Sequence, residues 1–166
     1  MRVAVLSDTH SQTGQVDRIM SLLLKHLQGV DQILHAGDIV CAELLDALGS
    51  IAPVQAVVGN MDSEELHMRL PERHVMQLAG HAIGLIHGWG APGDLPRKVV
   101  ERFIGSGGKP EVEVVVFGHS HQPLNEKRQG VLLLNPGSPT DRHFAPYHSM
   151  AFLDLGTEVH SEIIKV

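Results

Sequence analysis

Short apolar runs recur along the first sixty residues, and each of them ends at a polar cluster. Val3–Leu6, Gln32–His35 and Val54–Val58 have the length and the apolar character of buried strands. Between these runs, Val16–Leu27 places apolar side chains at helical spacing, and Glu43–Leu48 is also helical in pattern. The order strand, helix, strand, helix, strand predicts a parallel sheet with crossover helices.

The ends of the two helices carry recognisable signals. Thr13 is the predicted cap of the first helix and Gly29 its stop, and the second helix is predicted to end at Gly49. The apolar stripe of the first helix consists of Val16, Ile19, Met20, Leu23, Leu24 and Leu27.

The second part of the chain is richer in predicted strands. His74–Leu78 and His81–Ile86 flank a short Ala-Gly turn and predict a hairpin. A helix is predicted over Leu95–Ile104, followed by a loop over Gly105–Pro110. Four further strands are predicted over Glu113–Phe117, Val131–Leu134, Ser149–Leu155 and Glu158–Ile164. We therefore expect an α/β fold in which two mixed β-sheets pack together with helices outside, in one domain spanning residues 1–166.

Composition and charge narrow the function classes. The 166 residues are 43% hydrophobic and 19% charged, which supports a folded core rather than a disordered chain. The net charge of -6 argues against stable nucleic-acid binding by a basic surface. A phosphate-containing substrate stays open, because bound metal ions supply positive charge locally.

The single cysteine and the short apolar runs predict a cytoplasmic location. Cys41 allows no intrachain disulfide, which favours a reducing compartment, and we expect its side chain to be buried and inert. No apolar run approaches the roughly 18 residues of a membrane span, and the first residues lack the pattern of a signal peptide.

Aspartate, histidine or asparagine stands at the end of five predicted strands, in most cases beside a glycine. In open α/β sheets, ligands bind beyond the carboxyl ends of the strands, so these polar ends are expected to converge. The five segments are Asp8-Thr9-His10, Gly37-Asp38, Gly59-Asn60, His87-Gly88 and Gly118-His119-Ser120-His121.

Together the five segments offer two carboxylates, four imidazoles and one amide oxygen. The two pairs with i, i+2 spacing, Asp8 with His10 and His119 with His121, can each reach a shared site. This mixture suits Mn²⁺, Fe or Zn²⁺, contains too much nitrogen for Ca²⁺, and lacks the thiolates of a structural zinc site. Seven ligands suit two ions, with one carboxylate bridging them.

Each motif alone has a simpler explanation. An aspartate at a strand end is more often a turn or cap residue, Gly-Asn most often marks a turn, and a single histidine is commonly a core residue. The ordered set of five, all at strand ends, is far less expected by chance and favours a metal centre.

In this order, the motifs resemble the signature of the calcineurin-like metallophosphoesterases, over a stretch from Val3 to about Leu155. The segment Asn135-Pro136-Gly137-Ser138 and the small size resemble the branch of compact bacterial and archaeal phosphodiesterases, whose fold the retromer subunit Vps29 shares. The matching segments are Asp8-x-His10, Gly37-Asp38, Gly59-Asn60-Met61-Asp62, His87-Gly88 and Gly118-His119-x-His121.

The resemblance implies a four-layer αββα sandwich with a dinuclear metal centre. A hydroxide between the two ions would attack phosphorus in line, in a small phosphodiester or nucleotide-like substrate. Mn²⁺ is the expected metal, with Ni²⁺, Co²⁺, Fe or Zn²⁺ as alternatives. One ion would be held by Asp8, His10, Asp38 and His121, and the other by Asp38, Asn60, His87 and His119. The residues expected to act in catalysis are Asp38, Asn60, Asp62 and His87.

Two positions depart from the family pattern. Met61 stands where the larger phosphatases carry a histidine, and a thioether cannot protonate a leaving group, so good leaving groups should be favoured. Trp89 follows His87-Gly88 where many relatives have a second histidine, and it offers either a stacking face or ordinary packing.

Three further side chains near the motifs have open roles. Asp62 is expected either to orient Asn60 or a metal-bound water, or to cap a helix over Ser63–His67. Arg142 could contact a phosphate oxygen or remain solvated, and His35 is expected to brace the strand end before Asp38.

Three functions remain in competition. A phosphodiesterase is favoured. A Vps29-like protein-binding module would tolerate lost ligands, yet all seven are present. A phosphomonoesterase or nucleotide phosphatase is disfavoured by Met61, because poor leaving groups need an acid. Whether the chain forms a homo-oligomer stays open.

Overall fold

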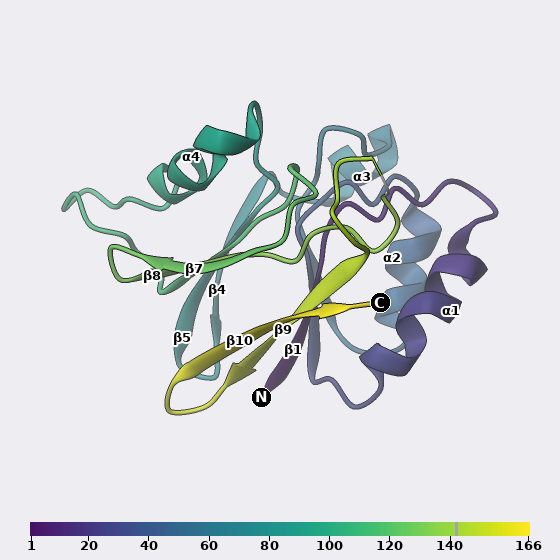
Figure 1. Ribbon diagram of the computed structural model, residues 1–166, viewed down its shortest axis with the longest axis horizontal. Coiled ribbons are helices and arrows are strands. Elements are labelled where there is room, and N and C mark those ends of the chain that lie inside the picture. Colours follow the sequence, from purple (N-terminus) through teal and green to yellow (C-terminus); the bar gives the residue numbers. More distant parts are fainter. Residues whose placement is uncertain (142) are drawn as a thin grey trace.

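The computed structural model describes residues 1–141 and 143–166, and its strands form two five-stranded mixed sheets (Figure 1). The first sheet has the order β10-β9-β1-β2-β3 and the second the order β4-β5-β6-β8-β7. The first sheet consists of β10 (Val159–Lys165), β9 (Ser149–Leu155), β1 (Arg2–Leu6), β2 (Gln32–His35) and β3 (Val54–Ala56). The second consists of β4 (Arg73–Leu78), β5 (His81–Ile86), β6 (Val114–Val116), β8 (Val131–Asn135) and β7 (Leu124–Arg128).

The strands at the middle of each sheet run parallel. β1 pairs with β2 and β2 with β3 in parallel register, while β5 pairs with β6 and β6 with β8 in the same way. The outer pairs β1–β9, β9–β10, β4–β5 and β7–β8 are antiparallel. The parallel strands thus direct their carboxyl ends to one edge of each sheet.

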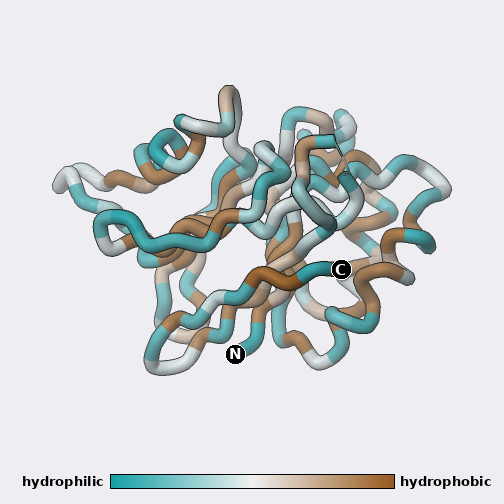
Figure 2. Tube along the Cα trace, in the orientation of Figure 1, coloured by the Kyte–Doolittle hydropathy of each residue, from teal (hydrophilic) through white to brown (hydrophobic). Residues whose placement is uncertain are grey.

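Alternation along the strands creates the layers. In β1, Val3 and Val5 belong to the cluster between the two sheets, whereas Ala4 and Leu6 belong to the cluster beneath the first two helices. Leu95 and Phe103 pack on the outer face of the second sheet. Figure 2 shows the hydrophobic stretches concentrated in the strands. The helical elements are α1 (Val16–Leu27), α2 (Ala42–Gly49), α3 (Glu64–Arg69), η1 (Pro92–Asp94) and α4 (Leu95–Glu101).

The four-layer αββα sandwich with two mixed sheets is therefore confirmed, and the predicted strands all exist within one or two residues of their bounds. No helix in the described ranges is long and apolar enough to cross a bilayer.

Several boundaries and side chains differ from the prediction. Thr13 does not cap α1: the chain turns at Gly14, which has a φ of +83°, and the helix begins at Val16 after Gln15. Leu24 is 45% exposed, because the face that packs on the sheet carries Ile19, Leu23 and Leu27 instead.

The helix predicted over Leu95–Ile104 ends at Glu101. The chain then tightens into turns with hydrogen bonds from the N–H of Phe103 to the carbonyl of Val100 and from that of Ile104 to Glu101, and Ile104 forms a bridge with Pro110. Strand β7 was not predicted, because the Leu124–Arg128 sequence is polar and lies at an exposed sheet edge. The short helix α3 appears in the sequence analysis only as the helix over Ser63–His67 that Asp62 would cap, and it spans Glu64–Arg69 in the structure.

One packing contact between β5 and the segment after α4 gives a test of the layered core. A Cβ added to Gly84 would lie 2.7 Å from the ring of Phe103, which is fully buried. Gly84→Ala should therefore destabilise the protein by about 1–3 kcal/mol in denaturant unfolding. Gly49→Ala, at the end of α2 with open space around it, is the control and should be neutral or stabilising by up to about 1 kcal/mol. Equal stability of the two variants would contradict the described packing.

Candidate metal centre

The ends of five parallel strands bring their polar side chains together. Asp8 follows β1, Asp38 follows β2, Asn60 follows β3, His87 follows β5, and His119 with His121 follows β6. Two groups of side chains have ligand atoms that all lie within 4.8 Å of one another. These groups are Asp8, His10 and His121, and Asp8, Asp38 and His87.

The backbone at this convergence is unusual. Among residues other than glycine, left-handed backbone is uncommon and costs free energy, and it concentrates at functional sites. Five of the seven predicted ligands adopt it. They are Asp8 (φ 54°), His10 (φ 45°), Asp38 (φ 54°), His119 (φ 71°) and His121 (φ 56°).

Two glycines allow neighbouring loops to lie directly against the carboxylates. A Cβ on Gly59 would fall 2.2 Å from both the backbone nitrogen and Oδ1 of Asp38. A Cβ on Gly118 would fall 1.8 Å from Ser7 Oγ and 2.7 Å from Asp8 Oδ2. Any side chain at either position would push the loop away from the site.

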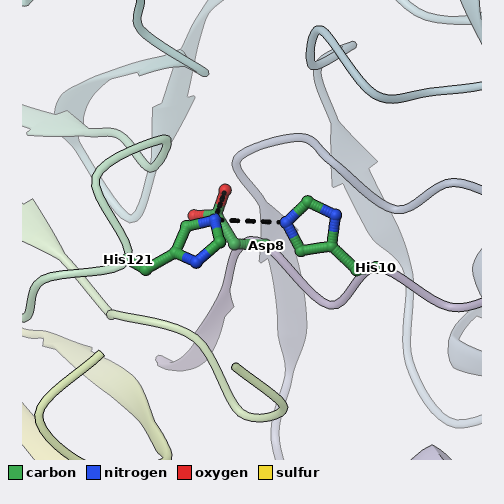
Figure 3. Close-up of side chains that lie close together, drawn as sticks. All are labelled: Asp8, His10 and His121. Atoms are coloured by element: carbon green, nitrogen blue, oxygen red, sulfur yellow. Dashed lines mark hydrogen bonds and ion pairs between the residues drawn. The ribbon is translucent and has the colours of Figure 1, made fainter. Parts of the chain in front are cut away.

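The first group is built around Asp8. Nε2 of His121 lies 3.4 Å from Asp8 Oδ1 and 3.1 Å from Nε2 of His10, and His10 Nε2 lies 3.7 Å from Asp38 Oδ2. Figure 3 shows the His10 and His121 rings facing each other beside the Asp8 carboxylate. Nitrogen atoms of two imidazoles and oxygen atoms of two carboxylates therefore surround one small space.

Asn60 and His119 lie next to the second group, on the side of Asp38 and His87. His87 Nε2 lies 3.4 Å from Asp38 Oδ2 and 3.2 Å from Asn60 Oδ1. His119 Nδ1 lies 3.1 Å from the same Asn60 oxygen, while its Nε2 lies 3.1 Å from the carbonyl oxygen of Gly90. Asp38 is the carboxylate that faces both His10 and His87.

Backbone N–H groups fix the two carboxylates. The N–H of Met61 donates to Asp38 Oδ1 at 2.7 Å, and the N–H of His119 donates to Asp8 at 3.0 Å. Burial raises the pKa of the Asp38 carboxyl, but the hydrogen bonds from His87 and Met61 outweigh this effect and lower it. Asp38 is therefore ionised.

The nearby carboxylates raise the pKa values of two of the imidazoles. Burial lowers the pKa of His87, yet Asp38 and Asp8 raise it above its ordinary value. Burial also lowers the pKa of His121, but the carboxylates of Asp8 and Asp141 raise it to about 9. The two buried carboxylates thus favour positive charge on the side chains that face them, which is the charge that a metal cation would supply.

The donor set fits divalent metal ions. His87 Nδ1 lies 2.7 Å from the carbonyl oxygen of Ala36, so its N–H is anchored there and Nε2 is left facing Asp38 and Asn60. His121 is held in the same way, with Nδ1 2.7 Å from Asp141 Oδ2 and Nε2 facing Asp8. Ring nitrogens oriented toward carboxylate and amide oxygens match the coordination of Mn²⁺, Fe or Zn²⁺.

Asp141 was missed by the sequence analysis. It lies in the loop after β8, where no motif marks it. Three backbone N–H groups hold its carboxylate in position. The N–H groups of His143, Phe144 and Ala145 all donate to its carboxylate, at 3.0, 2.9 and 3.1 Å. These bonds and His121 lower the pKa of Asp141, although burial acts in the opposite direction.

The segment Asn135-Pro136-Gly137-Ser138 supports the ligand loops from behind. Ser138 Oγ donates to the carbonyl of Asp8 at 2.7 Å, and the side-chain amide of Asn135 donates to the carbonyl of Gly118 at 3.0 Å. Both side chains are fully buried. This segment therefore holds the β1 and β6 loops at a fixed separation.

Asp62 ties two ligand loops together through their backbones. Its two carboxylate oxygens accept hydrogen bonds from the N–H groups of Gly59 at 2.7 Å and Val40 at 2.6 Å. Ser63, not Asp62, caps α3, by accepting from the N–H of Leu66. Asp62 thus holds the loop that carries Asn60, while the orientation of Asn60 by Asp62 and a role of Asp62 in catalysis stay predictions.

His35 braces the end of β2, as predicted. Its Nδ1 accepts from the N–H of Gly37 at 3.2 Å, and Nε2 contacts Thr9 Oγ1 at 3.1 Å. Burial lowers the pKa of His35 to about 3, so the ring is neutral. Cys41 is buried as expected, with its thiol 3.4 Å from Ser11 Oγ.

The two residues that depart from the family pattern, Met61 and Trp89, have exposed side chains. The Met61 side chain is 58% exposed and Trp89 is 42% exposed, with the Arg102 guanidinium 5.7 Å from the Trp89 ring centre. Trp89 is therefore not a core residue. Arg142 lies outside the described residues.

Several known proteins are similar to this chain in sequence or in fold. The chain is 34% identical over 173 residues to a probable metallophosphoesterase of Methanocaldococcus jannaschii, covering 100% of this chain and 82% of that protein. It is 24% identical over 176 residues to a phosphodiesterase of the same organism, covering 99% of both. A crystal structure of a Vps29 single mutant from Entamoeba histolytica matches 100% of this chain and 99% of that chain, with a TM-score of 0.73 and 23% identity.

The last likeness concerns the fold alone, because it falls below 25% identity. Residues 1–158 match the calcineurin-like phosphoesterase superfamily domain, which covers nearly the whole chain. With its strand-end ligand set and its two mixed sheets, the chain belongs to the calcineurin-like phosphoesterase superfamily.

Proposed function

We propose that the protein is a phosphodiesterase that depends on two divalent metal ions held by the strand-end side chains. The observation that carries this proposal is the mutual orientation of the histidines. Nε2 of His10 and Nε2 of His121 lie only 3.1 Å apart and both face carboxylates, an arrangement that a shared cation would stabilise. The relative named as a phosphodiesterase supports the choice of reaction.

Asp38 is the bridging ligand in this proposal, because it faces histidines of both groups. Mn²⁺ is the preferred ion, since the set combines hard oxygen with imidazole nitrogen. Asp8, His10, Asp38 and His121 hold one ion, and Asp38, Asn60, His87 and His119 hold the other.

The residues of the chain position the ions and the substrate. Bound divalent ions supply positive charge for the phosphoryl oxygens and lower the pKa of the attacking water. Asp141 positions His121, and Ala36 positions His87, so that each ring keeps Nε2 directed at its carboxylate. Asp62 and Ser138 hold the backbones of the ligand loops.

The absence of an acid at position 61 favours diesters with good leaving groups. The Met61 side chain is exposed and has no proton to donate, while its backbone N–H is occupied by Asp38. A leaving group must then depart with little protonation, which is easier for a stabilised anion such as a nitrophenolate.

The alternative of a Vps29-like binding module shares the fold, so the fold does not separate the two functions. The complete donor set favours the enzyme. A protein-binding surface would not require buried carboxylates aligned with oriented imidazoles.

Removal and return of metal tests the ion requirement. The chelator-stripped protein should be inactive on bis(p-nitrophenyl) phosphate, and Mn²⁺ should restore activity and raise the melting temperature, since binding to the folded state alone stabilises it. Metal analysis should give two ions per chain. Asp38→Asn, which weakens the shared ligand, should lose at least ~10²-fold in activity. Full activity with a single bound ion would overturn the two-metal proposal.

The Asp141–His121 pair gives a second test. Asp141→Asn keeps the size of the side chain but removes the charge that orients His121, and Mn²⁺ affinity should fall about 10–100-fold. Calorimetric titration at one fixed pH measures this. Asp154→Asn is the control, because that carboxylate is exposed and pairs with Arg2 away from the site. Unchanged affinity in a folded Asp141→Asn protein would show that the pair does not support metal binding.

The missing acid gives a third test. Met61→His places an imidazole beside the site at an exposed position where the fold tolerates the change. A positioned acid typically contributes ~10²–10⁴-fold, so the ratio of monoester to diester turnover should rise. Steady-state rates on p-nitrophenyl phosphate and bis(p-nitrophenyl) phosphate measure the ratio. A flat or lower ratio with both metals bound would show that another feature sets the diester preference.

A further inference from the structure

The seven arginines that the structure describes fall into two groups, according to whether a carboxylate lies nearby. Among residues 1–141 and 143–166, four arginines lie within 4.0 Å of a carboxylate. They are Arg2, Arg69, Arg97 and Arg128. Arg18, Arg73 and Arg102 have no such partner within the same ranges, and all three line cavities beside the candidate metal centre.

The first cavity opens beside one half of the centre. It has a volume of about 330 Å³ and its wall includes Asn60 and His87, together with Trp89, Arg73 and Arg102. The Arg102 guanidinium lies over the Trp89 ring, and Arg73 Nη1 donates to the backbone carbonyl of Arg102. This hydrogen bond fixes Arg73 next to Arg102 and leaves two cations at one wall.

One carboxylate also lines this cavity. Glu72 is exposed and precedes β4, and neither arginine of the cavity is within 4.0 Å of a described carboxylate. The cavity therefore retains an excess of positive charge in a protein whose net charge is -6.

The second cavity opens beside the other half of the centre. It has a volume of about 650 Å³, and its wall includes His10 and Thr9 as well as Arg18. Asp141 also contributes to this wall, but its carboxylate is already occupied by His121 and by three backbone N–H groups. Among the described residues that line this cavity, Arg18 is the arginine, and it has no carboxylate partner within 4.0 Å.

The positions of the two cavities match the shape of a diester. A phosphodiester has an arm on each side of phosphorus, and the predicted ligands lie between the two cavities: His10 borders one, while Asn60 and His87 border the other. A phosphorus atom at the centre would therefore direct one arm toward Arg102 and the other toward Arg18. An arginine without a carboxylate partner is suited to bind a phosphate.

On the basis of the proposed function, we propose that the substrates are linear diesters with a further phosphate on each arm, as in a short phosphorylated oligonucleotide. Arg102, supported by Arg73, binds the phosphate on one arm, and Arg18 binds the phosphate on the other. Trp89 offers its exposed ring to a planar base on the Arg102 side.

The proposal predicts that added negative charge on the substrate raises kcat/KM, and this direction can be tested. Added negative charge on a substrate should weaken its encounter with a protein of net charge -6 unless specific cations receive it. The test compares dithymidylate with no terminal phosphate (TpT), with one (pTpT or TpTp) and with both (pTpTp), on the Mn²⁺-loaded protein. We expect kcat/KM to rise about tenfold with each terminal phosphate, as for one charge-assisted hydrogen bond.

Variants assign each phosphate to its arginine. Arg102→Gln should remove the gain from one terminal phosphate and Arg18→Gln the gain from the other, mainly through KM. Arg102→Lys should restore part of the gain, which a purely structural role of Arg102 would not produce. Arg97→Gln is the matched control, because Arg97 is exposed, pairs with Asp94 and Glu101, and lines neither cavity.

The outcomes separate this inference from the proposed function. Hydrolysis of TpT and bis(p-nitrophenyl) phosphate with no gain from terminal phosphates would overturn the inference and leave the phosphodiesterase proposal in place. A loss shared equally by all four substrates in both variants would also overturn it. If no diester is hydrolysed, the proposed function fails, and calorimetric binding of pTpTp and of TpT to the same four variants still decides whether the arginines bind phosphate.

Discussion

The burial of two carboxylates at one point is the constraint on which the rest of the structure depends. Asp8 is fully buried and Asp38 is 2% exposed, and together with His87 they place ligand atoms within 4.8 Å of one another. Like charges at this separation repel strongly away from water. Three imidazoles face them, and backbone N–H groups donate to both. The surrounding loops therefore keep hydrogen-bond donors and imidazoles against these two residues, and the divalent ions of the proposed function would balance the same negative charge.

This constraint explains why the site is strained while the strands are regular. Left-handed backbone at Asp8, Asp38 and His119 makes the chain turn sharply just beyond the strand ends. Hydrogen bonds behind the predicted ligands hold this strained backbone: the Ser138 hydroxyl donates to the Asp8 carbonyl, and the N–H groups of Gly59 and Val40 donate to the Asp62 carboxylate. Gly59 and Gly118 let those loops close without a side chain in the way. Rigidity here comes from hydrogen bonds to the backbone, which a ligand set alone would not provide.

The sequence predicted the sandwich and the convergence of the ligands because both depend on local patterns. Buried parallel strands leave short apolar runs, and residues at their ends must meet at one edge. What could not be predicted depends on contacts between distant segments. Asp141 meets His121 across twenty positions through a loop with no motif, and β7 is a polar edge strand whose pairing with β8 leaves no periodic signal. Thr13 failed as a cap because a glycine turn after it moved the start of α1 to Val16.

The sequence alone also does not show which arginines form ion pairs with carboxylates. Arg97 and Arg102 are five residues apart and equally polar, yet their partners differ. Arg97 is neutralised by Asp94 and Glu101, while Arg102 lines a cavity that Glu72 also lines and has no described carboxylate within 4.0 Å. The difference follows from the end of α4 at Glu101: Arg97 keeps its helical neighbours at i-3 and i+4, whereas Arg102 follows the helix and turns toward Trp89. A fold shared with a Vps29 structure can thus carry different functions, because the centre sets the chemistry while loops and helix ends decide which charges remain free for a ligand.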